Sequence, residues 1–261
     1  MIRVGIGGWT FEEWRGPFFP KGLSHAKELE YASRKLTTIE INGTFYRTQT
    51  PATFKKWFAE TPDDFVFSIK APRYIVGKKE LAASGEMIDV FMKSGLAELK
   101  QKLGPILWQL APYKKFDAED IGGFLKLLPR ELGKLPLRHA LEIRSKSFLV
   151  PEFVELARKA GVAIVYADSD DYPAIADVTA PFVYLRLQRT SPDIDTGYAS
   201  SDLDRWAERA RLFAAGDAPD DLDRLVEKAP AKPKRPVFVY MISGAKLRAP
   251  AAAMALIERV K

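Results

Sequence analysis

The sequence predicts an α/β fold, a single (β/α)8 TIM barrel that spans residues 1–261. Eight short apolar runs alternate with segments of helical periodicity along the whole chain, which is typical of repeated βα units around a parallel sheet. The length of 261 residues suits one such barrel, which commonly has about 250. Hydrophobic residues make up 47% of the chain and charged residues 28%, so a sizeable core can be buried.

The expected strands are the eight apolar runs themselves. They cover residues 3–9, 37–45, 65–73, 105–110, 140–144, 162–168, 182–188 and 237–242. Eight parallel strands can close a barrel. The glycines Gly5, Gly7 and Gly8 belong to the first of these runs, because no strand precedes them as a dinucleotide-binding loop would require.

Local signals mark several of the helices between the strands. Thr50 before Pro51 is typical of a helix start, and Pro151 repeats the pattern without a capping side chain before it. Gly161 stands where the glycine at a helix end is expected. Ser201 resembles a capping residue ahead of a helix whose apolar face comprises Leu203, Trp206, Ala210 and Phe213.

Residues 216–236 are acidic first and then rich in proline and lysine. A strand follows this segment, and helix-to-strand connections lie on the bottom face of a βα barrel, away from the chemistry. We therefore expect a solvated insertion before the last strand rather than a linker between domains. Contact with nucleic acid through its lysines is the alternative.

Composition excludes some functions and leaves others open. The chain has no cysteine, which excludes disulfides, zinc–thiolate sites, iron–sulfur clusters and thiol catalysis. Two histidines, His25 and His139, are too few for a histidine-rich zinc site. Nucleophile-elbow, Walker and dinucleotide motifs are absent from the sequence, so no cofactor is expected. The formal net charge of +6 is compatible with acidic partners but is scattered along the chain.

The chain begins Met-Ile-Arg-Val-Gly and enters the first expected strand at once, without the pattern of a secretory signal. No apolar run approaches the roughly 18 residues needed to span a bilayer. We therefore expect a cytoplasmic protein with no membrane partner.

Charged and polar residues occur at alternate positions near the carboxyl ends of the expected strands. In a barrel strand such positions point inward, and functional groups gather where the strands end. Six charged side chains are expected to meet in one volume: Glu40, Lys70, Glu142, Arg144, Asp168 and Arg186. They form either a catalytic site or a structural ion-pair network that fills the barrel mouth, because buried charges require partners in both cases.

Aromatic and cationic side chains cluster in the loops after these strands, which suits a ligand with a flat part and an anionic part. The alternative is that the aromatics pack the loops onto the barrel, and Trp14 and Phe18 fit this role best. The residues concerned are Trp9, Phe11, Trp14, Phe18, Phe19, Phe45, Tyr46, Arg47, Arg73, Tyr74, Arg189 and Tyr198.

Asp168, Asp170 and Asp171 follow the sixth expected strand with a spacing that could supply oxygen ligands to Mg²⁺ or Mn²⁺. Such clusters also form helix caps and turns, which is the alternative here. Magnesium or manganese is thus the one cofactor that the sequence leaves open.

Several motifs together resemble the YecE-like family, domain of unknown function 72. They include Gly7-Gly-Trp9, Ile39-Glu-Ile-Asn42, Thr44-Phe-Tyr46, Lys70-Ala-Pro-Arg73, Leu103-Gly-Pro105, Glu142-Ile-Arg144, Ala167-Asp-Ser169 and Tyr184-Leu-Arg-Leu187. The resemblance covers nearly the whole chain and implies a TIM barrel, but no established reaction. It also implies site residues, namely Glu40, Asn42, Thr44, Tyr46, Lys70, Arg73, Gln109, Glu142, Arg144, Asp168 and Arg186.

The chain departs from the family pattern where imidazole and amide groups are expected. Gly77 and Ser145 replace histidines, Phe148 replaces a tryptophan, and Gln188 stands where a histidine is expected after Leu187. The paired asparagines expected near residues 242–243 are also replaced. These changes identify a divergent member whose proton-transfer or metal chemistry is altered or lost.

Strand position and resemblance together give a set of candidate site residues. The expected catalytic residues are Glu40, Lys70, Glu142 and Asp168. The expected substrate-binding residues are Trp9, Asn42, Thr44, Tyr46, Arg73, Gln109, Arg144, Arg186 and Gln188.

Three functions remain open. The first is an enzyme with hydrolase- or lyase-type acid–base chemistry on a phosphorylated or carboxylated substrate or a phosphodiester. The second is a nucleic-acid-binding protein, and the third is a non-catalytic barrel that binds an anion or a protein partner. We rank the enzyme first, because TIM barrels place catalytic residues at these strand ends.

Overall fold

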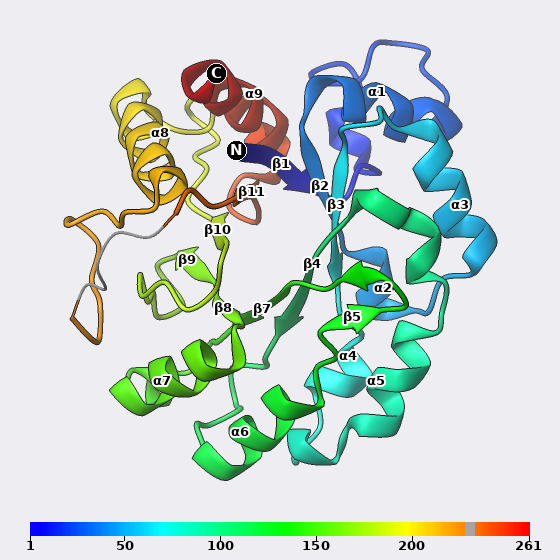
Figure 1. Cartoon of the computed structure of the whole chain (residues 1–261). Helices are drawn as coiled ribbons and strands as arrows, with labels where there is room; N and C mark the ends of the chain where they lie inside the picture. Colours follow the sequence, from blue (N-terminus) through cyan, green and yellow to red (C-terminus); the bar gives the residue numbers. More distant parts are fainter. Residues whose placement is uncertain (228–232) are drawn as a thin grey trace.

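Nine parallel strands form the main sheet of the computed structural model, which describes residues 1–227 and 233–261. They are β1 (Ile2–Gly7), β2 (Thr38–Ile41), β3 (Val66–Lys70), β4 (Leu103–Gln109), β7 (His139–Glu142), β8 (Ala163–Ile164), β9 (Tyr166–Asp168), β10 (Val183–Leu187) and β11 (Val237–Met241). The strand order is β8-β7-β4-β3-β2-β1-β11-β10-β9. The strands surround a central axis and the helices lie outside them (Figure 1). The fold is the predicted α/β barrel.

The sixth predicted strand is divided, which is why the sheet has nine strands and not the eight expected. Within this run, β8 pairs with β7 and β9 pairs with β10. Between them, the Val165 N–H donates to the Leu141 carbonyl at 3.0 Å. The two ends of the sheet thus belong to one continuous segment that changes neighbour along its length, and this segment closes the barrel.

Helices cover the outer face of the barrel between successive strands (Figure 1). The α-helices are α1 (Glu28–Lys35), α2 (Gly43–Tyr46), α3 (Pro51–Glu60), α4 (Arg73–Val76), α5 (Gly85–Met92), α6 (Ala118–Leu127), α7 (Pro151–Ala160), α8 (Ser200–Ala215) and α9 (Ala249–Val260). The second and third strands end earlier than predicted, because α2 and α4 begin directly after them. A short antiparallel pair, β5 (Glu131–Leu132) and β6 (Leu135–Pro136), was not predicted.

The local helix signals are confirmed with one exception. The Thr50 hydroxyl accepts the Thr53 N–H at 3.2 Å at the start of α3, and Gly161 ends α7 with φ 68°. Ser201 is not a cap, because α8 begins one residue earlier and Ala199 holds the cap position without a side-chain hydrogen bond. The predicted apolar face of this helix is buried, namely Leu203, Trp206, Ala210 and Phe213.

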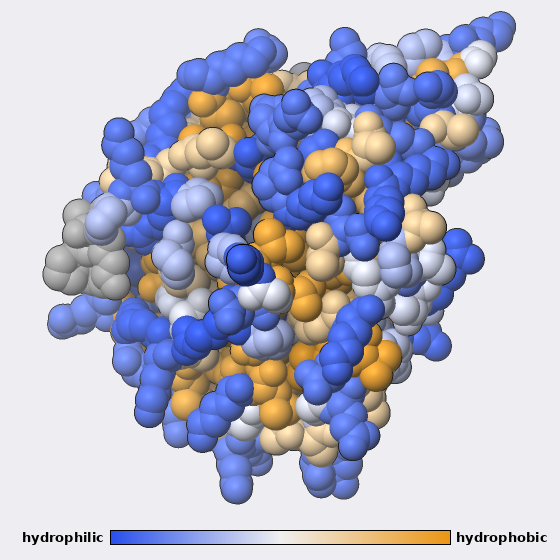
Figure 2. Space-filling view, turned by 45° about the vertical axis from the view of Figure 1, so that its right-hand side comes forward, coloured by the Kyte–Doolittle hydropathy of each residue, from blue (hydrophilic) through white to orange (hydrophobic). Residues whose placement is uncertain are grey.

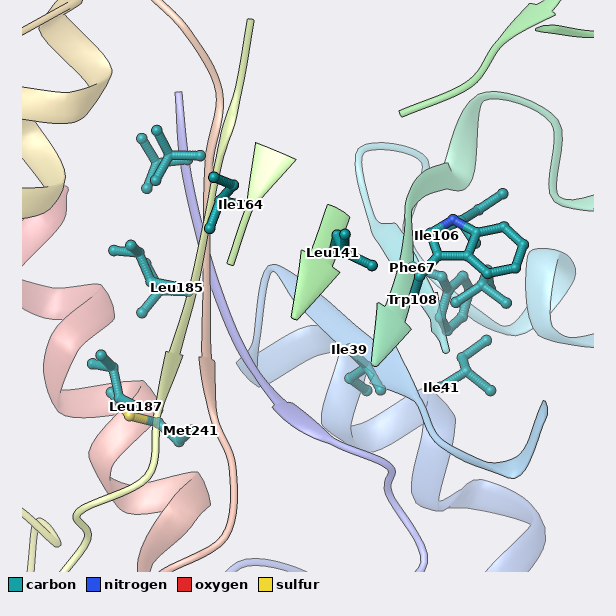
Figure 3. Packing of buried hydrophobic residues seen from close by; sticks show 14 of the residues in the cluster. Ile39, Ile41, Phe67, Ile106, Trp108, Leu141, Ile164, Leu185, Leu187 and Met241 are labelled. Carbon is teal, nitrogen blue, oxygen red and sulfur yellow. The ribbon is translucent and has the colours of Figure 1, made fainter. Parts of the chain in front are cut away.

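Two buried layers lie on opposite faces of the strands. Outward-facing residues pack against the helices. In Figure 3, Leu185 and Leu187 on one side of the barrel and Ile41 and Trp108 on the other side all belong to this outer layer. Inward-facing residues form a smaller cluster that includes Leu107, Ala140, Val165, Tyr184 and Tyr240. The alternation predicted from strand periodicity is confirmed for the second, third, fifth and seventh predicted strands.

Glycine in β1 allows the neighbouring strand to come close. A Cβ atom added at Gly5 would lie 1.8 Å from the Thr38 carbonyl oxygen, and one at Gly7 would lie 2.8 Å from the Asn42 amide nitrogen. No side chain fits at Gly5 unless β2 moves. The glycine-rich start of the chain therefore serves strand packing, as its assignment to a strand predicted.

The segment before β11 is only partly solvated, contrary to the prediction for residues 216–236. Ala218, Leu222 and Arg235 are buried. The Leu225 N–H donates to the Asp177 carboxylate at 2.7 Å, so this part of the segment is fixed to the barrel. Residues 228–232, which include the beginning of the predicted lysine–proline run, lie outside the described residues.

The surface visible in Figure 2 carries both hydrophobic and hydrophilic side chains. Figure 2 shows hydrophobic side chains between hydrophilic ones over the middle of one face. In the two described ranges, no helix combines the length and the apolar character needed to cross a membrane.

Candidate functional site at the barrel mouth

Two buried glutamates and one arginine form the centre of the barrel interior. Glu40 on β2 and Glu142 on β7 are fully buried, and Arg186 on β10 lies between them. Arg186 donates from Nε and Nη2 to the two oxygens of Glu40, each at 3.1 Å, and from Nη1 to Glu142. One guanidinium thus bridges two carboxylates from opposite parts of the sheet.

Further hydrogen bonds complete the shell of each glutamate. Gln109 donates to both Glu142 oxygens at 3.0 and 3.1 Å, and Arg144 Nε donates to one of them at 3.0 Å. The Tyr184 hydroxyl donates to Glu40 at 2.7 Å. Burial acts to raise the pKa of Glu142, but Arg186 and Arg144 outweigh it, so that its pKa is lowered and the carboxylate is charged.

A layer of tyrosines closes the interior below this network. Tyr184 and Tyr240 lie with ring centroids 4.9 Å apart. Their hydroxyls hydrogen-bond with Ser68 at 2.8 Å and Thr38 at 2.9 Å. Burial raises the pKa of both tyrosines, so these groups are neutral hydrogen-bonding partners. The interior is therefore closed at this level and the site opens toward the carboxyl ends of the strands.

Lys70, at the end of β3, forms no ion pair with any residue that the structure describes. Its side chain is 8% exposed, and the amine lies over the Phe45 ring, 4.2 Å from the centroid. In the part of the chain that the structure describes, the amine makes no hydrogen bond and no ion pair. Burial and the nearby Arg186 lower the pKa of Lys70 to about 8.

The charges at the mouth do not balance. Three cations, Lys70, Arg144 and Arg186, face the carboxylates of Glu40 and Glu142. Arg186 and Arg144 engage those carboxylates directly. When Lys70 is protonated, one positive charge is left without a counter-ion, so the mouth has the electrostatics of an anion site.

An open groove with a volume of about 490 Å³ lies beside this cluster. Residues at the ends of four neighbouring strands, β2, β3, β4 and β7, and in the segments after them line it: Phe45, Arg73, Tyr74, Val76, Gly77, Lys78, Gln109, Leu110, Ala111, Pro112, Tyr113 and Arg144. Arg144 also stacks on Tyr172, with its Cζ 4.3 Å from the ring centroid. The groove therefore joins the ion-pair network to exposed aromatic rings.

Asp168 does not join the cluster, contrary to the expectation that six charges meet in one volume. Its strand position faces the helices, as the neighbouring Tyr166 shows by packing against Trp206 of α8 at 5.7 Å. Asp168 lies 3.4 Å from Arg189 and 3.4 Å from the Tyr198 hydroxyl. The parity predicted for the sixth strand was wrong because the inward residue of this segment is Val165.

Other candidates lie at the rim or in structural positions. Trp9 packs edge-on against Trp57 of α3 at 5.2 Å, away from the groove. Thr44 is buried and donates to the Lys70 carbonyl at 2.7 Å, so it fixes the backbone at the end of β3. Tyr46 is exposed on α2.

Two side-chain amides lie near the strand ends at the mouth. Asn42 is close to Gly7, and among the described residues its side-chain amide makes a single long hydrogen bond, of 3.4 Å, to the Glu40 carbonyl. Gln188, which replaces an expected histidine, has a buried Nε2 with no acceptor among the described residues. The two amides thus retain unused hydrogen-bonding capacity.

The acidic cluster after β9 is engaged by an arginine. Arg189 pairs with Asp168 at 3.4 Å and with Asp170 at 3.0 Å, and the Asp171 N–H donates to the Ser169 hydroxyl at 3.2 Å. Across residues 1–227 and 233–261, no group of three or more His, Asp or Glu side chains is arranged to hold a metal ion. The Asp171 contact belongs to a turn, which was the alternative for this cluster, and the ion pairs with Arg189 were not predicted.

Two aromatic residues of the site were not predicted from the sequence. Tyr113 lines the groove and Tyr172 stacks on Arg144, yet neither was selected. Tyr113 follows β4 by four residues, so its place after a strand end was an available signal. The packing of Tyr172 depends on the path of a long loop, for which the sequence has no periodic signal.

Fold and site together define a TIM barrel with an ion-paired interior and an open, cationic mouth at the carboxyl ends of its strands. The family described as "Protein of unknown function DUF72" matches residues 3–261. The chain therefore belongs to the DUF72 family, as the resemblance of its motifs indicated.

Individual relatives agree with this assignment. UPF0759 protein YunF of Bacillus subtilis (strain 168) is 29% identical over 160 residues, which are 59% of this chain and 55% of that protein. A DUF72 family protein of Thermotoga maritima MSB8 has a TM-score of 0.71 at 21% identity, covering 98% of this chain and 97% of the other. A DUF72 family protein of Enterococcus faecalis V583 has a TM-score of 0.70 at 19% identity, covering 99% and 96%. These structures share the fold.

Proposed function

We propose that this protein is an enzyme that binds a small anionic substrate at the barrel mouth and uses Lys70 as its reacting group. The observation that carries the proposal is the state of Lys70, a largely buried lysine whose amine has no acceptor among the described residues, in a mouth where cations outnumber carboxylates. A largely desolvated charge without an ionic partner is costly, and a group perturbed in this way in a cleft is a candidate for a functional role.

The proposal divides the residues into three roles. Arg144 and Arg73 line the groove and hold the anionic group of the substrate. Glu40 and Glu142 fix Arg186 and maintain the field at the mouth, because their oxygens are already occupied by hydrogen bonds. Lys70 transfers a proton or attacks the bound substrate, for which a pKa of about 8 is well matched to neutral conditions.

A thermal-shift screen tests the binding step. Phosphorylated metabolites, sugar acids, 2-oxo acids and nucleotides are added to the purified protein with and without Mg²⁺ or Mn²⁺. A ligand specific for the native state raises the melting temperature by mass action. We expect the shift to be lost in Arg144→Ala and retained in Arg205→Ala, which removes an exposed arginine of α8. Ligands that shift the wild type are then assayed for turnover with Lys70→Met.

Two outcomes contradict the proposal. One is that no anion shifts the melting temperature, and the other is that a shift persists unchanged in Arg144→Ala. Binding without turnover by the wild type would favour the non-catalytic barrel that binds an anion.

A nucleic-acid-binding function is the second candidate, favoured by the exposed tyrosines at the mouth. Tyr46, Tyr74 and Tyr113 are all exposed, and the last two line the same groove as Arg73 and Arg144. Stacking of bases on such rings contributes about 1–3 kcal/mol per base. Fluorescence anisotropy with a short single-stranded oligonucleotide tests it. Affinity should fall steeply with salt and fall further in Tyr113→Ala, and salt-independent binding would contradict it.

A further inference from the structure

We propose that Lys70 forms a covalent imine with the carbonyl group of an anionic substrate. This inference rests on the proposed function and names its substrate class, a carbonyl compound that carries a carboxylate or a phosphate. It is supported by the geometry of the amine, by the contrast with two other buried lysines and by the position of the arginines.

The surroundings of Lys70 suit a nucleophilic amine. Thr44 holds the Lys70 carbonyl at 2.7 Å and thereby fixes the backbone at the end of β3. The amine lies on the face of Phe45, which offers no lone pair, so nothing among the described residues competes with a substrate for it. Lysine becomes a nucleophile when it is desolvated or lies next to another cation, and Lys70 meets both conditions through its burial and Arg186.

Two other buried lysines show what a structural lysine looks like in this protein. Lys102 is 1% exposed and its amine donates to the Phe58 and Thr61 carbonyls, both at 2.7 Å. Lys114 is 9% exposed and its amine donates to the Lys79 carbonyl at 2.6 Å and to Asp120. Lys70 is buried to a similar degree but has no such acceptors in the described ranges. Burial alone therefore does not explain why the Lys70 amine lacks hydrogen-bond acceptors.

Imine formation needs no reactant other than the Lys70 amine and the carbonyl compound. The neutral Lys70 Nζ attacks the carbonyl carbon, and the C=O π bond opens to give a carbinolamine. The carbinolamine hydroxyl takes up a proton and leaves as water, while the nitrogen lone pair forms the C=N bond. Counted from the protonated amine, one carbonyl is consumed, one water is released, and the single positive charge remains on the iminium.

The iminium then draws electrons from bonds at the adjacent carbon, which is how lysine enzymes make or break C–H and C–C bonds. Arg144 and Arg73 hold the anionic group of the substrate in the neighbouring groove. The positive charge of the iminium remains next to Glu40 and Glu142, which already balance two cations. The expected reaction class is therefore bond making or breaking next to a carbonyl.

Borohydride trapping tests the inference. The protein is incubated with pyruvate, with dihydroxyacetone phosphate or with the neutral ketone acetone, and is then reduced with sodium borohydride. Intact mass and peptide mapping locate the adduct. We expect one reduced adduct, on Lys70, with at least one anionic probe and at least tenfold less with acetone. The adduct should be absent in Lys70→Arg and retained in the matched control Lys114→Arg, with thermal unfolding used to verify that both variants fold.

The outcomes separate this inference from the proposed function. Absence of a Lys70 adduct with both anionic probes overturns the imine, while anion binding that depends on Arg144 would still support the proposed function. Equal labelling by acetone overturns the anionic substrate class. Labelling that persists in Lys70→Arg shows reaction at surface lysines and overturns the assignment to Lys70. The trapping rate should also rise with pH around a midpoint near 8.

Discussion

Lys70 and Arg186 are both cations inside the barrel, but they differ in their partners. Arg186 is shared by Glu40 and Glu142, which raise its pKa against the effect of burial. Lys70 has no such partner among the described residues, and burial lowers its pKa. Arg186 therefore stabilises the core, whereas the charge on Lys70 destabilises the folded state.

Replacement of Lys70 should therefore stabilise the protein. We expect Lys70→Met to raise the free energy of unfolding at pH 7 by on the order of 2 kcal/mol, because a buried charge is removed. Between about pH 8 and 10.5 the unfolded chain holds a proton that folded Lys70 has released, so wild-type stability rises with pH across this window. The advantage of the variant should shrink accordingly.

Urea unfolding at pH 7 and pH 10 measures this difference. Lys55→Met, which replaces an exposed lysine of α3, is the control and should show no comparable gain. A Lys70→Met variant less stable than the wild type at pH 7 would show that the amine has a stabilising partner after all.

Replacement of Arg186 should have the opposite effect. Arg186→Met leaves Glu40 and Glu142 buried without their shared partner, and breaking a buried ion pair from one side costs about 3–5 kcal/mol. Changing both glutamates to glutamine in the same chain should recover much of this loss. Chemical unfolding of the single and triple variants checks this, and a single variant as stable as the wild type would refute the role of the bridge.

The individual site residues were predictable where position along a strand determined them. Glu40, Lys70, Glu142, Arg144 and Arg186 come together as their shared inward parity predicted. Which of them would be paired was not predictable, because this depends on distances across the barrel that no local pattern encodes. The sequence alone therefore could not distinguish Lys70 from the other charges.

At the level of elements, alternation along a strand predicted the two faces except in the sixth run. There, β8 and β9 meet at Val165, and inward residues are Ala163 and Val165 instead of Ile164 and Tyr166. Both sets are apolar enough to be buried, so the pattern did not discriminate between them. The predicted parity, together with the family resemblance, placed Asp168 in the cluster.

The contact between β1 and β2 gives an element-scale prediction. Gly5→Ala would place a methyl group 1.8 Å from the Thr38 carbonyl oxygen, which forces the two strands apart. We expect a loss of about 3 kcal/mol in the free energy of unfolding. Gly43→Ala, whose Cβ would meet its nearest neighbour at 3.8 Å, is the matched control and should be close to neutral. Equal stabilities of the two variants would argue against the close approach.

For the whole molecule, the alternation of strands and helices was sufficient to predict the barrel, because each βα unit is local in sequence. The predicted extent of one domain, residues 1–261, remains a prediction. The curated relative aligns over only 55% of its own length, so it does not delimit the domain.

Cooperative unfolding tests this extent. Four of the five tryptophans, Trp57 among them, lie in the first half of the chain, and Trp206 lies in the second half. If the barrel is one domain, single-tryptophan variants that keep one or the other should report the same urea midpoint, together with circular dichroism. Two separated transitions would indicate two domains.

The guanidinium bridge also bears on how the chain acquires its shape. Arg186 follows Glu40 by 146 residues and Glu142 by 44, so the bridge assembles only when β10 has docked against the earlier strands. Until then both carboxylates remain hydrated, because dehydrating them without the arginine is costly. Burial of Glu40 and Glu142 in a partly formed barrel is therefore unfavourable before Arg186 is in place. The ion-paired mouth is therefore completed only after β10 has joined the barrel.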